Sequence, residues 1–128
     1  MSATRILLVD DEPEIVRLLT RRLSRLGYEV ASAADGTQAL ALLQEAPFDV
    51  AIFDFMMPGM NGLELADQCR HRYPGVKILM LTGSPVVAEI EMARYPCLRK
   101  PLENLGDVEL AVEQLLAAPG NEPGEGDG

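Results

Sequence analysis

The sequence predicts an α/β fold in which helices cover both faces of a five-stranded parallel sheet. Short apolar runs alternate with amphipathic segments along the chain, and the most apolar of these runs lack polar residues in their interiors. Strands of that kind are typical of parallel sheets that are buried on both sides. Strict alternation of five strands with five helices therefore predicts a doubly wound, three-layer sandwich.

Three strongly apolar runs are expected to form strands, and two weaker runs complete the sheet. Tyr28–Ala33 mixes polar and apolar residues, as an edge strand does, and a fifth short strand is expected near Cys97 and Leu98. The three apolar runs are Arg5–Val9, Asp49–Phe53 and Lys77–Leu81.

Helices are expected in the segments between the strands. The first, Pro13–Leu26, has proline in its first turn and Gly27 directly after it, which are favourable start and stop residues. The segment Pro85–Arg94 is short and weakly patterned, so the fourth helix is expected to be short or irregular. The remaining helices are expected over Gly36–Gln44, Gly62–Tyr73 and Leu102–Ala118.

Size and composition fit one globular domain. The chain has 128 residues, a formal net charge of −9 and 48% hydrophobic residues, which excludes a disordered acidic chain. The negative charge argues against nucleic acid or an anionic membrane as a direct partner. No apolar run approaches the ~20 residues of a membrane span. Cys69 and Cys97 form no CxxC pattern, so a cytoplasmic protein with reduced thiols is expected.

The negative charge is concentrated near the C-terminus. Residues 103–128 contain seven acids and no base, which leaves thirteen acids and eleven bases, a net of −2, in residues 1–102. Residues 1–118 are expected to form the domain, and residues 119–128 a flexible acidic tail or a truncated linker. The length leaves no room for a second domain, so the chain is expected to be a stand-alone domain or one excised from a larger protein.

Polar side chains follow the expected strands, and the carboxyl ends of parallel strands meet at one edge of the sheet. Three carboxylates at that edge repel one another. A bound Mg²⁺, which prefers oxygen ligands, removes this repulsion. An aspartate can act as a nucleophile toward phosphorus, while lysine and threonine suit phosphoryl oxygens. The set therefore fits Mg²⁺-dependent phosphoryl transfer. Its members are Asp10 and Asp11 after the first strand, Asp54 after the third, Thr82 after the fourth and Lys100 after the fifth.

Other common sites for phosphate or metal are excluded by their motifs. The position of a dinucleotide-binding GxGxxG holds Asp10, Asp11 and Glu12 instead, which repel pyrophosphate. The chain contains no GxxxxGKS or GxxxxGKT, so it has no P-loop. One histidine and no cysteine cluster leave no convincing zinc site.

Around these residues the sequence resembles the receiver domain of bacterial two-component response regulators. The resemblance covers about residues 4–117 and implies a flavodoxin-like sheet with strand order 2-1-3-4-5. Four segments carry it in the family's order: ILLVDDEPEI at 6–15, FDFMMPGMNG at 53–62, LTG at 81–83 and LRKP at 98–101.

The resemblance also implies partners and a role for each site residue. A histidine kinase or phosphotransfer protein would donate a phosphoryl group in the presence of Mg²⁺, and the signal would pass to an unknown downstream protein. The chain would be a monomer or weak dimer that assists its own phosphorylation and dephosphorylation without being a conventional enzyme. The implied roles are phosphoacceptor and metal ligand for Asp54, direct metal ligand for Asp11, ligand through water for Asp10, backbone-carbonyl ligand for Met56, switch hydroxyl for Thr82, phosphate-binding lysine for Lys100 and a cis peptide at Pro101.

Two departures from the family concern how phosphorylation is reported. Cys97 stands where the family usually has an aromatic switch residue, and Tyr95 lies two residues earlier. The stretch from Thr82 to Lys100 is also shorter than usual by about four residues, roughly one helical turn. We therefore expect phosphorylation-driven dimerisation through the fourth and fifth helices to be weak or absent.

Two other functions remain open from the sequence. One is a phosphorylation-independent binding module with a vestigial site. The other is a small phosphatase with an aspartyl nucleophile, although Met56 stands where such enzymes need a second aspartate.

Several further residues have a structural and a functional interpretation. Arg17, Arg21 and Arg25 form a stripe that is either a solvated face or a docking surface. The methionines beside Asp54 are expected to pack within their loop, His71 to be solvated, and Cys97 to fill a small space.

Overall fold

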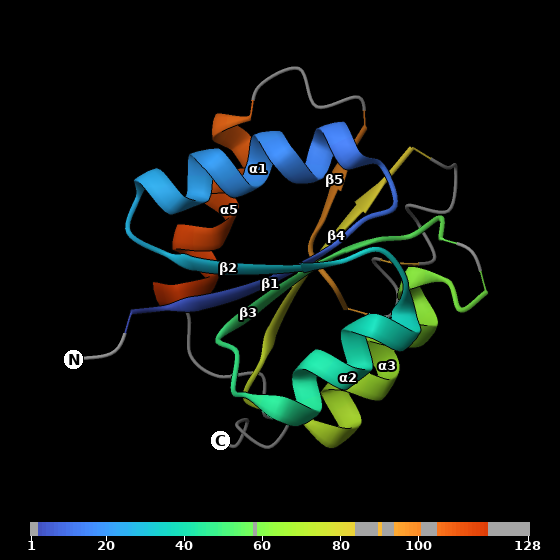
Figure 1. Ribbon diagram of the computed structural model, residues 1–128. Helices are drawn as coiled ribbons and strands as arrows, with labels where there is room; N and C mark the ends of the chain where they lie inside the picture. The colour runs from blue at the N-terminus through green and yellow to red at the C-terminus, as the bar shows by residue number, and fades with distance from the viewer. Residues whose placement is uncertain (1–2, 58, 84–89, 91–93, 101–104, 118–128) are drawn as a thin grey trace.

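The computed structural model describes residues 3–57, 59–83, 90, 94–100 and 105–117. Their strands form one parallel five-stranded sheet in the order β2-β1-β3-β4-β5, which confirms the expected topology (Figure 1). The strands are β1 (Arg5–Val9), β2 (Glu29–Ala33), β3 (Val50–Asp54), β4 (Lys77–Thr82) and β5 (Cys97–Arg99).

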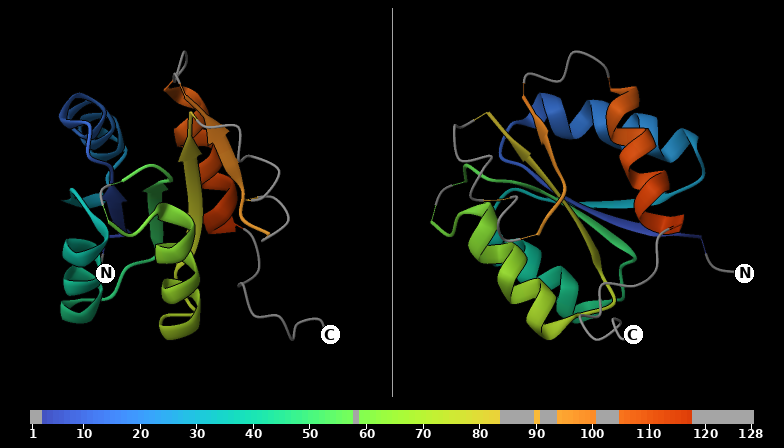
Figure 2. Two further views of the ribbon diagram at one scale, coloured as in Figure 1. Left: turned by 90° about the vertical axis from the view of Figure 1, so that its right-hand side faces the viewer. Right: turned by 180° about the vertical axis from the view of Figure 1, so that it is seen from behind.

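Helices lie on both faces of the sheet, with α1 and α5 on one face and α2 and α3 on the other (Figures 1 and 2). The described residues thus contain four helices rather than the five expected. The expected helix over Pro85–Arg94 falls largely outside the described residues, as do Pro101 and residues 119–128. The four helices are α1 (Pro13–Arg25), α2 (Gly36–Glu45), α3 (Gly62–Arg72) and α5 (Gly106–Ala117).

Local sequence fixes where two of these helices begin. The Asp35 side chain accepts a hydrogen bond from the Gln38 N–H at the start of α2. At α3, Asn61 accepts from the Glu64 N–H, and Glu64 accepts in return from the Asn61 N–H, a reciprocal capping box. These caps start α2 and α3 close beyond the strand ends.

The sheet separates two apolar clusters. Leu7 and Val9 of β1 face the cluster under α2 and α3, whereas Ile6 and Leu8 face the cluster under α1 and α5. All four are fully buried, because a central parallel strand is covered on both sides. None of the helices in the described ranges is long and apolar enough to cross a membrane.

Candidate functional site

The sheet register brings the predicted acidic residues together. Val9 of β1 pairs with Phe53 of β3, so the next residues on these strands, Asp10 and Asp54, are neighbours at the carboxyl edge. Oxygens of Asp10, Asp11 and Asp54 all lie within 4.8 Å of one another. Asp10 and Asp54 are buried, whereas Asp11 is exposed. The sequence-based expectation of one acidic cluster at this edge is therefore met.

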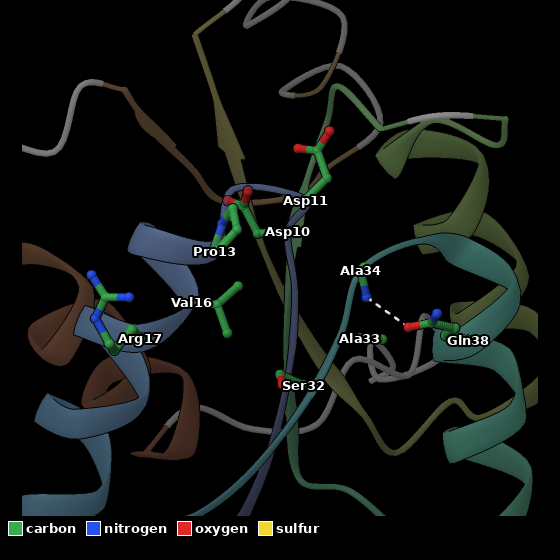
Figure 3. A pocket seen from close by; sticks show the side chains of 9 residues that line it. All are labelled: Asp10, Asp11, Pro13, Val16, Arg17, Ser32, Ala33, Ala34 and Gln38. Carbon is green, nitrogen blue, oxygen red and sulfur yellow. Dashed lines mark hydrogen bonds between the residues drawn. The ribbon is translucent and has the colours of Figure 1, made fainter.

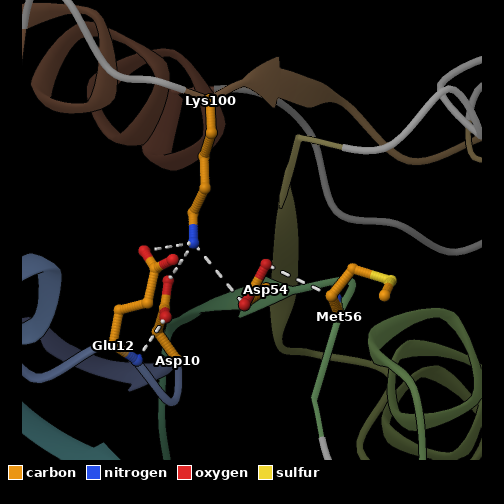
Figure 4. A network of polar contacts seen from close by, with 5 residues as sticks. All are labelled: Asp10, Glu12, Asp54, Met56 and Lys100. Atoms are coloured by element: carbon orange, nitrogen blue, oxygen red, sulfur yellow. Dashed lines mark hydrogen bonds and ion pairs between the residues drawn. The ribbon is translucent and has the colours of Figure 1, made fainter.

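Lys100 directly follows the edge strand β5, and its side chain reaches this cluster from there. Its backbone N–H donates to the Thr82 carbonyl at 2.8 Å, which continues the pairing of β4 with β5. Its ammonium lies 2.9 Å from Asp10 Oδ2, 3.0 Å from Glu12 Oε1 and 3.5 Å from Asp54 Oδ2 (Figure 4). One cation thus contacts three carboxylates.

Burial and charge perturb the acid–base properties of this cluster. Burial, and then the nearby charge of Asp10, raise the pKa of Asp54 to about 6, although Lys100 and the Met56 N–H oppose the shift. Burial lowers the pKa of Lys100, but its contacts with Asp10 and Glu12 outweigh that effect, so the net shift is upward. The lysine therefore stays positively charged beside a crowded set of acids.

Gly62 allows the chain to return close to Asp54. A Cβ atom at this position would overlap the Asp54 carbonyl oxygen and lie 2.8 Å from the Phe55 Cα. The Gly62 N–H donates to the Phe55 carbonyl at 2.8 Å. Since the obstructing atoms belong to the backbone, no side-chain rotation relieves the overlap. The first residue of α3 therefore has to be glycine for Asp54 to keep this position.

Two cavities meet at the acidic cluster. One, of about 670 Å³, is lined by charged residues of the cluster and by apolar Ile15 and Met56. The other, of about 350 Å³, lies between α1 and the end of β2, where Arg17 and Gln38 form part of its wall (Figure 3). Asp11 borders both, so a ligand in the larger cavity is accessible to this carboxylate.

The donor set fits a hard divalent cation. Three carboxylates converge within metal-binding reach, and oxygen ligands are those that Mg²⁺ prefers. Oδ2 of Asp10 is buried and faces the Lys100 ammonium without a well-aligned hydrogen bond. A buried carboxylate oxygen with incomplete hydrogen bonding favours an added positive charge nearby. The site therefore has the charge and the ligand chemistry for Mg²⁺.

The remaining predicted residues surround this cluster. Thr82 is fully buried at the end of β4. The Met56 backbone nitrogen lies 3.4 Å from Asp54 Oδ1, and the residue is 59% exposed. Cys97 is the first residue of β5 and packs against the cluster under α2 and α3, but it is only partly buried and not the fully buried filler expected.

The nearby aromatic, Tyr95, is held by α3 rather than by the site. It is 4% exposed, and its hydroxyl donates to Asp67 Oδ1 at 2.8 Å. The Arg70 guanidinium lies over its ring, 5.3 Å from the centroid. Two contacts thus tie the segment before β5 to α3. Sequence reasoning missed this anchor, because nothing in the spacing of Tyr95 and Asp67 marks them as neighbours.

Sequence reasoning also missed Glu12 as a partner of Lys100. The two residues are 88 positions apart and meet only because β1 and β5 end at the same edge. A signal was present, since Glu12 directly follows Asp10 and Asp11 at a strand end. From the sequence alone, this position indicates only a charge that repels pyrophosphate.

The structure also shows where the arginine stripe of α1, His71 and the methionines beside Asp54 lie. Arg17, Arg21 and Arg25 are exposed on α1, whereas Arg22 pairs with Glu109 of α5 at 2.6 Å. His71 is exposed in the last turn of α3, as expected. Met57 and Met60 pack against the apolar cluster under α2 and α3, whereas Met56 is exposed.

A doubly wound sheet with acids at the carboxyl ends of β1 and β3 and a lysine after β5 defines a receiver-type signalling domain. The family model for the response regulator receiver domain matches residues 6–105. The chain belongs to that family.

Known relatives and solved structures agree with this assignment. The chain is 36% identical over 118 residues to the response regulator receiver protein CpdR from Brucella abortus, covering 89% of this chain and 98% of CpdR. It spans 35% to 52% of the length of other curated relatives, several of them transcriptional regulators. It also resembles the crystal structure of response regulator TrrA from Thermotoga maritima in complex with Mg²⁺ and BeF, with a TM-score of 0.81, 34% identity and coverage of 88% and 99%.

A further solved structure contains TrrA together with the histidine kinase ThkA. This chain matches it with a TM-score of 0.79 and 35% identity, covering 89% of this chain and 99% of the matched chain. These likenesses extend over nearly the whole described domain.

Proposed function

We propose that this protein accepts a phosphoryl group on Asp54 from a histidine kinase or phosphotransfer protein in a reaction that requires Mg²⁺. The observation that carries the proposal is the contact of one lysine with three carboxylates, two of them buried, at the mouth of a cavity of about 670 Å³. The relatives add support, because TrrA is known in complex with Mg²⁺ and BeF and with a histidine kinase.

In the proposed reaction, a carboxylate oxygen of Asp54 attacks phosphorus. The bond from phosphorus to the donor's histidine nitrogen breaks, and its electron pair leaves with that nitrogen. Lys100 offsets charge on the phosphoryl oxygens, and the Thr82 hydroxyl donates to one of them. Asp11, Asp54, the Met56 carbonyl and, through water, Asp10 would hold Mg²⁺. The cation supplies positive charge that allows carboxylates and phosphoryl oxygens to approach.

The proposed signal then passes to another protein. Thr82 is the proposed switch hydroxyl, and Cys97 takes the place of the usual aromatic. Tyr95 is bound to Asp67 of α3, so it is not poised to follow the Thr82 hydroxyl. We therefore propose that the signal passes by a route other than rotation of Tyr95.

Chemical phosphorylation tests this function. Acetyl phosphate with Mg²⁺ is expected to add one phosphoryl group to the wild-type chain, measured as intact mass, and none to Asp54→Asn. Asp35→Asn is the matched control, since asparagine caps a helix about as well as aspartate. It is expected to be modified like the wild type.

Two results would favour the alternatives. A wild-type chain that stays unmodified, and whose NMR spectrum does not respond to beryllofluoride with Mg²⁺, would indicate a binding module with a vestigial site. Turnover of a free phosphomonoester that is lost in Asp54→Asn would indicate a phosphatase.

A further inference from the structure

Glu12 competes for the lysine of the proposed phosphoryl site. The Lys100 ammonium donates to Glu12 Oε1 at 3.0 Å, a shorter contact than the 3.5 Å to Asp54 Oδ2. Glu12 thus takes up part of the charge that a phosphoryl group on Asp54 would require (Figure 4).

The backbone holds Glu12 in place for this contact. Its N–H donates to Asp10 Oδ1 at 2.9 Å, and its carbonyl accepts from the Val16 N–H at 3.1 Å. Pro13 follows it and favours the extended conformation that Glu12 adopts, with φ −94° and ψ 106°. Although Glu12 occupies the N-cap position of α1, its side chain does not cap the helix. The carboxylate instead accepts a hydrogen bond from the Lys100 ammonium.

The number of ammonium donors and the burial of each partner indicate which Lys100 contact breaks when a phosphoryl group binds. An ammonium has three N–H donors, and Lys100 already contacts three carboxylates. The side chain of Asp10 is 0% exposed, so leaving it unpaired is costly. The side chain of Glu12 is 57% exposed and returns to water easily. Glu12 is therefore the partner that Lys100 releases at least cost.

We infer that Glu12 is a positioning residue that occupies Lys100 while Asp54 is unmodified and gives it up when a phosphoryl group binds. This inference rests on the proposed function of Asp54. It makes Glu12 a determinant of how readily the chain leaves its unphosphorylated state, because every phosphoryl group has to displace this ion pair.

The test is a titration of beryllofluoride with Mg²⁺, followed by the backbone amide signal of Gly83. Glu12→Gln keeps the length of the side chain and removes its charge, and it is expected to bind about two- to fivefold more tightly, as suits a partly exposed ion pair. Glu12→Asp keeps the charge but is one methylene shorter, so it is expected to bind more tightly as well. Glu14→Gln removes a charge from the first turn of α1 without touching Lys100 and is expected to match the wild type.

The salt dependence of beryllofluoride binding is a measurement that a purely structural role of Glu12 would leave unchanged. Because the Glu12 contact is partly exposed, salt screens it, and the difference between Glu12→Gln and wild type is expected to shrink as ionic strength rises. Unfolding midpoints without beryllofluoride check that the variants remain folded.

The outcomes separate this inference from the proposed function. Equal affinities of Glu12→Gln and a wild type that binds beryllofluoride would overturn the inference alone. Equal gains in Glu12→Gln and Glu14→Gln would also overturn it, since a general charge effect would then suffice. A wild type that binds no beryllofluoride would overturn the proposed function and the inference with it.

Discussion

The two halves of the sheet hold their parts of the site by different means. β1 and β3 have five residues each, and every residue of β3 is buried. β5 has only three residues, which are partly buried or exposed. Asp10 and Asp54 are therefore positioned by the core itself, whereas Lys100 depends on the short pairing with β4, on its ion pairs and on the contacts of the segment before β5.

This difference teaches where rigidity is needed. The proposed phosphoacceptor and metal ligands have to work at fixed distances, and a fully packed strand provides such distances. In the inferred exchange of Glu12 for a phosphoryl group, Lys100 would have to move slightly, and a short strand with exposed ion pairs would permit that movement. The hydrogen bond from Tyr95 to Asp67 ties the chain before β5 to α3.

The largest expected effect tests the comparison directly with two leucines of the same apolar cluster. Leu8 in β1 is 0% exposed, and Leu98 in β5 is partly buried. We expect Leu8→Ala to lower the free energy of unfolding by about 3 kcal/mol, because it leaves a cavity in a close-packed core. Leu98→Ala is expected to cost about 1 kcal/mol. Urea denaturation measures both, and equal losses would contradict the comparison.

A smaller effect is expected at Gly62, which lies against the end of the fully buried strand β3. Gly62→Ala forces a Cβ against the backbone of Asp54 and Phe55, so we expect a loss of about 2 kcal/mol in stability. Gly75→Ala is the control, since no atom lies within 4 Å of its ideal Cβ position. Its unfolding curve is expected to match the wild type closely. A Gly62→Ala variant as stable as Gly75→Ala would show that the β3–α3 connection yields easily.

The smallest effect is expected in the other half, at Tyr95. Tyr95→Phe removes the hydroxyl that donates to Asp67, and we expect a loss of about 1 kcal/mol. Tyr73→Phe is the control, because among the described residues no hydrogen bond of the Tyr73 hydroxyl is found. Thermal unfolding compares the two variants. Equal changes would mean that the Tyr95 contact adds no stability to the β5 edge.

Much of the fold was predictable from short-range pattern. The run Arg5–Val9 gave a strand with those bounds, and Pro13 and Gly27 marked the ends of α1 to within a residue or two. The prediction for α5 began four residues before the Gly106 start found in the structure. The difference covers residues 102–105: residues 102–104 are outside the described part of the chain, and Leu105 lies in a turn before the helix.

The acidic cluster was predictable for a different reason. Asp10, Asp11 and Asp54 each follow an apolar run, and a parallel sheet brings the ends of such runs to one edge. Side-chain partners were not predictable in this way. Glu12 with Lys100, Tyr95 with Asp67 and Arg22 with Glu109 are pairs between distant segments, and no periodicity along the chain encodes them.

The sequence by itself determined the alternation of strands and helices, the parallel sheet and the residue types at its carboxyl edge. The periodicity of apolar residues and the positions of turn residues reflect local structure, so they can be interpreted without knowing the fold. The tertiary structure alone decided which carboxylates share Lys100, which of them are buried, and that Gly62 lies against Asp54. Those features depend on distances between segments far apart in the chain, which only packing sets.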